Sequence, residues 1–255
     1  MSEVAPAREL PLPRWVPAAL SFVAGYVDIF TFLALFGLFV AQVTGSFVTA
    51  GAELVTHDVG IAGKAIAVVG FLFAAGLTAA LIALVQERRR AALPWMLGFE
   101  TTLLAVFTVA ILAGAPFAGA NDWHGVLAGL FGAMAMGAQS VTVRLLMRGV
   151  PQTNVMTGNM TALGIETTAL ILAWRRRARD PENPGNDREF AAVRSRLATV
   201  LAIATGFLFG AAAGAVSYAK VGLSAVPLAV VIVGALTVWA LLRERSEDQH
   251  HETQH

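Results

Sequence analysis

The sequence is poor in charge and contains no cysteine. Charged residues make up 14% of its 255 residues, whereas hydrophobic residues make up 56%. A soluble domain carries about 25% charged residues, so this chain has too little charge to cover the surface of a water-soluble fold. The absence of cysteine excludes disulfides, thiolate metal sites and cysteine nucleophiles. The mean hydropathy of +0.67 points the same way, and we predict an integral membrane protein.

Enzyme signatures are missing as well. The sequence has no H-E-x-x-H zinc motif, no G-x-S-x-G nucleophile elbow, no P-loop and no dinucleotide fingerprint. Asp122 and His124 are close in sequence but have no evident nucleophile beside them. We therefore expect no enzymatic activity, no cofactor and no metal site. The three histidines near the C-terminus belong to a polar tail, residues 243–255.

Six apolar runs are long enough to cross a bilayer, since a spanning helix needs about 20 mostly apolar residues. The first run is followed by no small-residue cleavage site, so we interpret it as a retained helix and not as a signal peptide. Two further apolar segments, 44–57 and 155–173, are too short or too polar for a comfortable crossing. The six runs are 15–38, 61–85, 94–114, 124–146, 197–219 and 222–242.

The arginines predict how these spans are oriented, because cytoplasmic loops hold the excess of Lys and Arg. If segments 44–57 and 155–173 enter the membrane without crossing it, all five arginine clusters and both termini fall on one side. Only Lys64 and Lys220 then lie outside. We predict a multi-pass protein of the bacterial inner membrane with both termini in the cytoplasm and a cytoplasmic loop at 175–196. The clusters are Arg8/Arg14, Arg88–Arg90, Arg144/Arg148, Arg175–Arg196 and Arg243/Arg245.

The two halves of the chain repeat the same short words in the same order. Residues 44–54 read TGSFVTAGAEL and residues 157–167 read TGNMTALGIET, so Thr, Gly, Gly and Glu recur at identical offsets. GFLF follows in both halves, at 70–73 and 206–209. Upstream, Asp28 in AGYVD takes the place of Gln139 in AMGAQ. The matching pairs are Thr44/Thr157, Gly45/Gly158, Gly51/Gly164 and Glu53/Glu166.

This duplication predicts an all-α fold with an inverted repeat. Each half contains a spanning helix, a short intramembrane half-helix and two more spanning helices. Because three spans is an odd number, the two halves enter the membrane in opposite directions, as in many secondary transporters. We therefore predict one membrane domain of six transmembrane helices plus two half-helices, in a 3+3 inverted repeat. The first repeat covers about 15–114 and the second about 124–242.

The same motifs resemble those of the YoaK-like family of small bacterial inner-membrane proteins. The resemblance rests on GYVD at 25–28, TGS at 44–46, MGAQ at 136–139 and TGN at 157–159. It covers nearly the whole chain, and Ser46 stands where Asn is usual. The resemblance implies the fold and topology of that family. The family has no known function, so the resemblance implies no substrate.

Asp28 is the first candidate for a functional residue. It lies about 14 residues into the first span, which is roughly 21 Å along a helix that crosses about 30 Å of hydrocarbon. Ionisable residues at such depth usually face a bundle interior or a watery cavity and mark a pathway for ions or solutes. We expect Asp28 to load and release a proton near physiological pH. The alternative is a protonated Asp28 that only joins two helices.

The two Thr-Gly motifs supply the remaining candidates. A half-helix that begins inside the membrane exposes unpaired N–H groups, which attract anions. Thr is a common N-cap residue and Gly permits close approach, so the alternative is that these residues only cap and pack. Glu53, with His57 as its expected partner, and Glu166 are secondary candidates with a structural ion-pair role as their alternative. The expected solute or coupling-ion site comprises Asp28, Thr44, Gly45, Ser46, Gln139, Thr157, Gly158 and Asn159.

These features predict a small secondary transporter or exporter of a small polar or anionic solute, coupled to protons through Asp28. One alternative is a membrane scaffold or partner subunit that transports nothing, and another is a passive channel. The expected partners are the lipid bilayer and the solute. We expect no nucleic acid, because anchoring on the cytoplasmic side already explains the arginines. Self-association into a homo-oligomer stays open.

Overall fold

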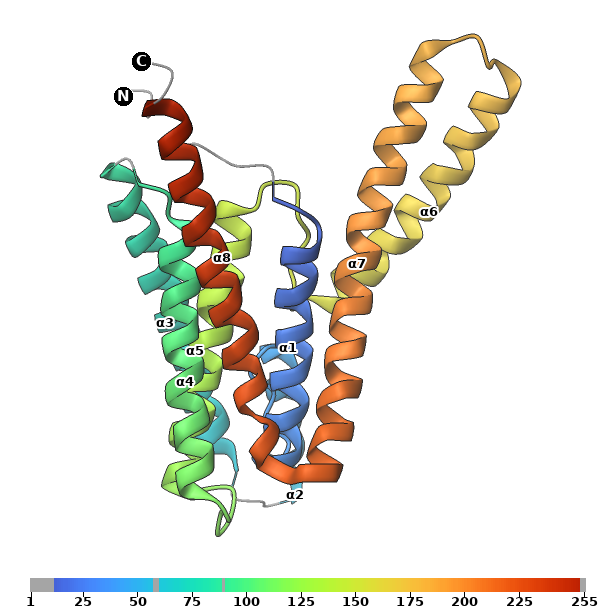
Figure 1. The fold of residues 1–255 in the computed structure, drawn as a ribbon. Helices are drawn as coiled ribbons and strands as arrows, with labels where there is room; N and C mark the ends of the chain where they lie inside the picture. The colour runs from blue at the N-terminus through green and yellow to red at the C-terminus, as the bar shows by residue number, and fades with distance from the viewer. Residues whose placement is uncertain (1–11, 57–59, 89, 253–255) are drawn as a thin grey trace.

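The computed structural model describes residues 12–56, 60–88 and 90–252, and within these ranges the protein is helical without strands (Figure 1). Six helices are long and apolar enough to cross a membrane, which confirms the predicted all-α membrane fold. The helices are α1 Trp15–Ala34, α2 Val43–Thr56, α3 Ile61–Glu87, α4 Leu93–Gly114, α5 Trp123–Leu146, α6 Met156–Arg179, α7 Pro184–Val221, η1 Gly222–Ala225 and α8 Pro227–Glu252.

The two segments that we predicted to enter the membrane without crossing it, 44–57 and 155–173, form helices of different length. α2 has 14 residues and is short, as predicted. α6 has 24 residues and extends past the predicted end at 173. Its last turn carries Arg176, Arg177 and Arg179. Arginine is a good helix former and a cation near a helix C-terminus is stabilising, so the basic segment continues the helix.

Residues 175–196 form a helical hairpin and not the loop that we predicted. The turn is limited to the residues between Arg179 and Pro184, where the Asn183 side chain accepts a hydrogen bond from the Gly185 N–H and caps α7. Ion pairs from Arg176 to Glu189, at 2.7 Å, and from Arg177 to Asp187, at 2.5 Å, join the two helices. Proline and asparagine correctly marked the turn, but the residues on both sides favour helix.

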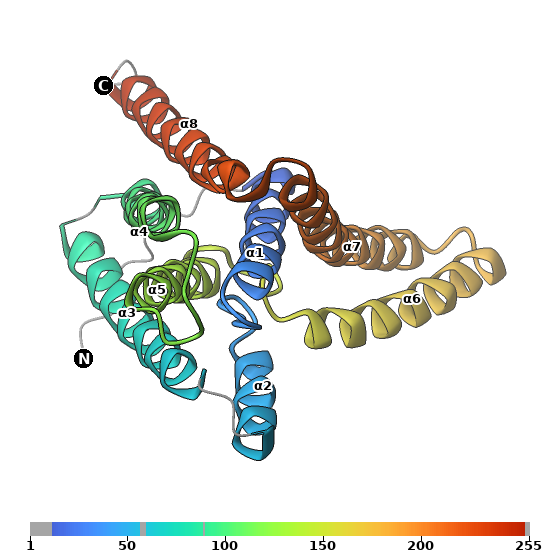
Figure 2. The same cartoon turned by 90° about the horizontal axis from the view of Figure 1, so that it is seen from below.

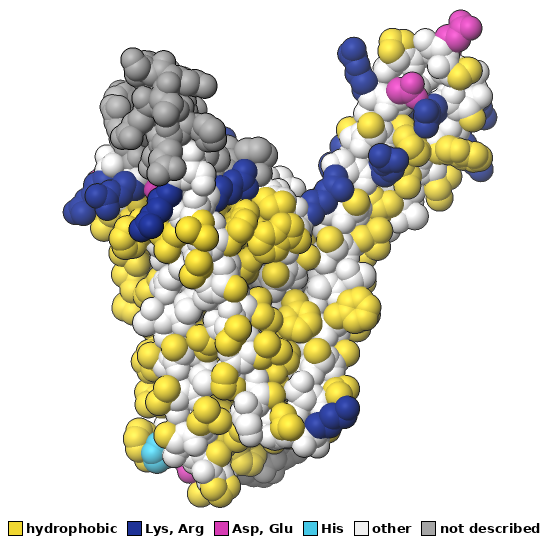
Figure 3. Space-filling view, viewed as in Figure 1, with side chains coloured by type: hydrophobic (Ala, Val, Ile, Leu, Met, Phe, Trp, Pro, Cys, Tyr) yellow, Lys and Arg dark blue, Asp and Glu magenta, His cyan; other side chains and the backbone are white. Residues whose placement is uncertain are grey.

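The hairpin of α6 and α7 extends away from the other helices in both ribbon views (Figures 1 and 2). The start of α1, the end of α3, the start of α4, the C-terminal part of α8 and the tip of the hairpin lie toward the same end of the molecule (Figure 1). Lys and Arg side chains gather at that end and along the hairpin (Figure 3). The connection between α4 and α5 lies at the opposite end, together with η1 (Figure 1).

Helix pairs that join one half of the chain to the other pack at very short distance. A Cβ atom at Gly25 of α1 would lie 2.3 Å from the Phe207 carbonyl oxygen of α7, and one at Gly137 of α5 would lie 2.4 Å from the Phe71 carbonyl oxygen of α3. Both phenylalanines are the second residue of a GFLF word. Each copy of this word therefore packs against the first helix of the other half, at a glycine that lies near Asp28 or Gln139.

α5 begins at a capping residue that explains the Asp122–His124 pair. The Asp122 side chain accepts hydrogen bonds from the N–H groups of Ala118, at 3.1 Å, and His124, at 2.9 Å. These bonds lower the pKa of Asp122. The residue starts the helix in the manner of other acidic N-caps, and this accounts for its place beside His124.

Candidate functional site

Asp28 holds a segment of chain that turns back after α1. The backbone reverses at Phe36 and Gly37, which have φ values of 54° and 75°, and the following residues return toward the middle of the helix. The Asp28 Oδ1 atom accepts hydrogen bonds from the Val40 and Ala41 N–H groups, each at 2.8 Å. Only 3% of the Asp28 surface is exposed, and its Oδ2 atom has no hydrogen-bond partner among the described residues.

Gln139 plays the corresponding role in the second half. Its Nε2 atom donates to the Thr153 Oγ1 atom at 2.8 Å and to the Leu20 carbonyl oxygen at 3.0 Å. Thr153 lies four residues before Thr157, just as Val40 lies four residues before Thr44. In both halves, a polar residue of the first helix thus holds the segment that leads into the next helix. The Gln139 Oε1 atom is buried without a partner in the described part of the chain.

The two returning segments meet inside the bundle, at a place that we call the loop junction, residues 40–41 and 153–154. The Asn154 Nδ2 atom donates to the Ala41 carbonyl oxygen at 3.3 Å and to the Ser140 Oγ atom at 2.6 Å. All four residues of the junction are buried. The Asn154 Oδ1 atom again has no partner among the residues described. The junction therefore combines non-helical backbone with buried oxygen atoms that lack donors.

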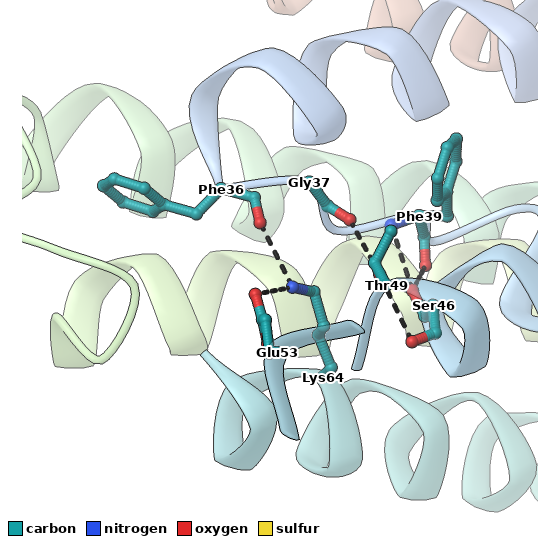
Figure 4. Close-up of polar contacts among 7 residues, drawn as sticks. All are labelled: Phe36, Gly37, Phe39, Ser46, Thr49, Glu53 and Lys64. Carbon is teal, nitrogen blue, oxygen red and sulfur yellow. Dashed lines mark hydrogen bonds and ion pairs between the residues drawn. The ribbon is translucent and has the colours of Figure 1, made fainter. Parts of the chain in front are cut away.

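Ser46 and Asn159, the third residues of the two motifs, hold the two returning segments from the helices that follow them. The Ser46 Oγ atom accepts from the Phe39 N–H at 3.0 Å and donates to the Phe39 carbonyl oxygen at 2.7 Å (Figure 4). The Asn159 Nδ2 atom donates to the Gln152 carbonyl oxygen at 2.8 Å. Each side chain reaches back seven residues, so serine replaces asparagine here without losing the contact.

The Thr-Gly residues themselves lie away from the junction. Thr44, Thr157 and Gly158 are exposed, and Gly45 is half-buried with Phe39 at its Cβ position. α2 begins at Val43 and α6 at Met156, so each Thr lies inside the first turn and does not occupy the N-cap position that we expected. No side chain caps α6, whose N-cap residue is Val155.

The two secondary acids form ion pairs within their own halves. Lys64 of α3 donates to Glu53 of α2 and, at 3.2 Å, to the Phe36 carbonyl oxygen (Figure 4). Lys64 is buried in the first turn of α3. Glu166 of α6 pairs with Arg196 of α7 at 3.0 Å. His57, the expected partner of Glu53, lies outside the described residues.

Asp28 lines neither of the two cavities that can be described. One is a groove of about 620 Å³ between α1, α7 and α8, with an apolar lining and Arg14 at its edge. The other has only about 20 Å³ and lies beside Lys64, Phe36 and Leu38. A space of that size holds about one water molecule. In this conformation the two cavities do not provide the polar cavity at Asp28 that a transporter open to one side would have.

Glu100 is the residue that sequence reasoning missed. Although it lies only six residues after Pro94, its exposed fraction is 0% and neither carboxyl oxygen has a hydrogen-bond partner in the described ranges. The signal was present in the sequence, because a carboxyl group inside the 94–114 run meets the same criterion that singled out Asp28.

Comparison with known proteins gives a family but no function. No curated protein and no solved structure matches this chain. One family, described as a protein of unknown function (DUF1275), matches residues 16–239. The match runs from the second residue of α1 into α8 and so includes the loop junction and both copies of the repeat. The chain therefore belongs to the DUF1275 family of proteins of unknown function.

Proposed function

We propose that this protein is a small secondary transporter or exporter and that the loop junction is its central site. The observation that carries the proposal is the set of buried acceptor oxygens without donors at and beside the junction: Asp28 Oδ2, Gln139 Oε1 and Asn154 Oδ1. Non-helical backbone is tolerated at membrane depth where it is buried in protein or lines a path. Unwound segments near the bilayer midplane form the ion and substrate sites of many transporters.

The alternative of a scaffold or partner subunit draws support from the bonds that Asp28, Gln139 and Ser46 make to nearby backbone and side chains. A scaffold gains nothing, however, from buried oxygens that remain unsatisfied, because each costs about 1–3 kcal/mol. A passive channel is less well supported, since neither described cavity reaches Asp28. We therefore favour a transporter in an occluded state.

The chemistry of the junction favours a solute that donates hydrogen bonds or carries positive charge. The unsatisfied atoms are acceptor oxygens, and one of them belongs to a carboxyl group. The Thr-Gly residues, which prompted the idea of an anionic solute, are largely exposed. We propose that Asp28 binds the solute or its coupling ion directly, with Asn154 and Gln139 as neutral partners.

We also propose the 3+3 inverted repeat, as the YoaK-like resemblance implies. Its support is the equivalence of contacts between halves: Asp28 with Val40 and Gln139 with Thr153, and the two GFLF words on opposite first helices. The third helices of the halves also meet, since the Thr101 and Thr237 hydroxyl oxygens are 3.1 Å apart. Two such units moving against each other provide alternating access.

The orientation in the bacterial inner membrane is a separate prediction. A reporter fused at Gly185, in the first turn of α7, should read as cytoplasmic, and one fused at Ala118, between α4 and α5, as periplasmic. The reason is the gathering of Lys and Arg at the end that holds the start of α1 and the tip of the hairpin. Alkaline phosphatase and fluorescent-protein fusions measure this directly. A periplasmic signal at 185 would contradict both the topology and the inverted repeat.

Transport itself is tested with purified protein in liposomes. A panel of cationic, neutral and anionic solutes is offered with and without a pH gradient, and empty liposomes serve as the control. We expect uptake of at least one cationic or donor-bearing solute above the control. A folded protein that moves no solute of the panel under either condition would favour the scaffold.

A further inference from the structure

Glu100 is a buried carboxyl group that the proposed solute site does not use. It lies on the face of α4 that is buried in the bundle, and no donor reaches either of its oxygens among the described residues. An ionised carboxylate in such a place is very costly, because neither water nor a counter-charge stabilises it. The group is therefore neutral in this conformation.

The helices around Glu100 bring no charged partner to it. α4 packs against α5 and α8, with smaller contacts to α3 and η1. α5 carries ionisable groups only near its ends, at His124 and Arg144, and α8 carries none before Arg243. In α3, Lys64 near its start is paired with Glu53, and Glu87 is its last residue; η1 has no ionisable side chain.

Glu100 lies at the depth of the second half of the loop junction. It is seven residues from Leu93, the first residue of α4, and Gln139 is seven residues from Leu146, the last residue of α5. These ends of the two neighbouring helices lie on the same side of the bundle (Figure 1). At 1.5 Å per residue, Glu100 and Gln139 therefore each lie about 10 Å along the helix from that end. A protonated Glu100 adds one O–H donor at this depth, where Gln139 Oε1 and Asn154 Oδ1 both lack donors.

The two buried carboxyl groups have unlike surroundings. Asp28 receives two backbone N–H bonds, whereas Glu100 receives none. Pairs of carboxyl groups in unlike surroundings take different roles, one as a proton carrier and the other as a charged group. The environment of Asp28 suits a carboxylate that binds a solute, and that of Glu100 suits an acid that keeps its proton until water reaches it.

We propose that Glu100 carries the coupling proton, while Asp28 binds the solute at the loop junction. This inference rests on the proposed transport function. In the occluded state Glu100 is a carboxylic acid. When the bundle opens and water enters, the O–H bond of Glu100 breaks, the proton passes to water and the carboxylate is hydrated. Glu100 then takes up a proton from the opposite side of the membrane before the protein returns to the occluded state.

The protonation of Glu100 can be read without any transport assay. A hydrophobic carbodiimide adds to a protonated carboxyl group, and the adduct rearranges to a stable N-acylurea with no atom lost. Mass spectrometry of peptides from protein treated in detergent should find this adduct at Glu100, with less adduct as the pH is raised. Glu166, paired with Arg196, is the matched control and should stay unmodified. An unmodified Glu100 at every pH would overturn the inference.

The coupling role is read in liposomes. Glu100→Gln should lose uptake driven by a pH gradient and should keep solute exchange at equal pH on both sides. Glu100→Met, which removes a buried polar group and should fold at least as well, should show the same loss. Retention of gradient-driven uptake in either variant would overturn the inference. Failure of the unmodified protein to move any solute would instead count against the proposed function, and the carbodiimide result would still report on Glu100.

Discussion

Asp28→Asn is expected to abolish solute uptake while the melting temperature stays close to that of the unmodified protein. Asparagine keeps an oxygen that can accept the N–H groups of Val40 and Ala41, now 2.8 Å from Oδ1, so the returning segment remains anchored. The variant loses the charge and replaces the unpartnered Oδ2 acceptor with an NH2 donor, so a cationic or donor-bearing solute no longer finds its partner. The measurement is uptake by protein in liposomes, normalised to folded protein and read beside thermal unfolding in detergent.

Asp28→Ala is the matched comparison, because it removes the anchor together with the charge. Two hydrogen bonds to a carboxyl group are lost, each worth about 1.5–3 kcal/mol when the group is charged. Its melting temperature should therefore fall clearly below that of Asp28→Asn. If Asp28→Asn transports normally and keeps its response to a pH gradient, Asp28 has no part in solute binding and serves only to hold the segment.

Gly25→Ala and Gly137→Ala should each destabilise the fold strongly. The new methyl group would lie 2.3 Å from the Phe207 carbonyl oxygen in one variant and 2.4 Å from the Phe71 carbonyl oxygen in the other. Backbone atoms cannot rotate away, so the paired helices must separate. Overpacking of this kind costs about 1–3 kcal/mol or more. Thermal or denaturant unfolding in detergent should show similar losses for both variants, because both methyl groups meet a backbone carbonyl oxygen at nearly the same distance.

Gly76→Ala provides the control within the same set of helices. Gly76 lies in α3, and nothing occupies the space within 4 Å of a Cβ atom placed there. Alanine favours helix over glycine by about 1 kcal/mol, so this variant should be as stable as the unmodified protein or more so. A loss at Gly76 equal to that at Gly137 would show that the glycines act through helix propensity or lipid contact and not through close packing.

The spanning helices could be predicted from the sequence because bilayer thickness sets the length of an apolar run. Asp28 and Gln139 could be found for a related reason, since a polar side chain in the middle of such a run usually faces the interior of the bundle or a watery cavity. The Arg-rich hairpin was mistaken for a loop because charge and turn residues were given more weight than the helix propensity of the flanking residues. Glu100 was not singled out because it lies only six residues after Pro94, near one end of its apolar run.

The loop junction could not be predicted in the same way. The partners of Asp28 are backbone N–H groups of Val40 and Ala41, and every residue but proline offers such a group. Their meeting with Asn154 depends on how two segments far apart in the chain cross inside the bundle. The outward position of Thr44 and Thr157 follows from where the helices begin, and a shift of one residue in that start changes which side chains face inward.

The length of α7 has a mechanical consequence. Its 38 residues form one continuous helix. It packs against α1 at Gly206 and Gly210, is held again by the hydrogen bond from Arg14 to Ser195 at 2.6 Å, and then extends away from the bundle (Figure 1). From Ser195 to Pro184 the helix spans about 16 Å, so a tilt of about 10° at this contact displaces the far end by about 3 Å. The hairpin therefore acts as a lever that magnifies small rotations inside the membrane into movements at its tip.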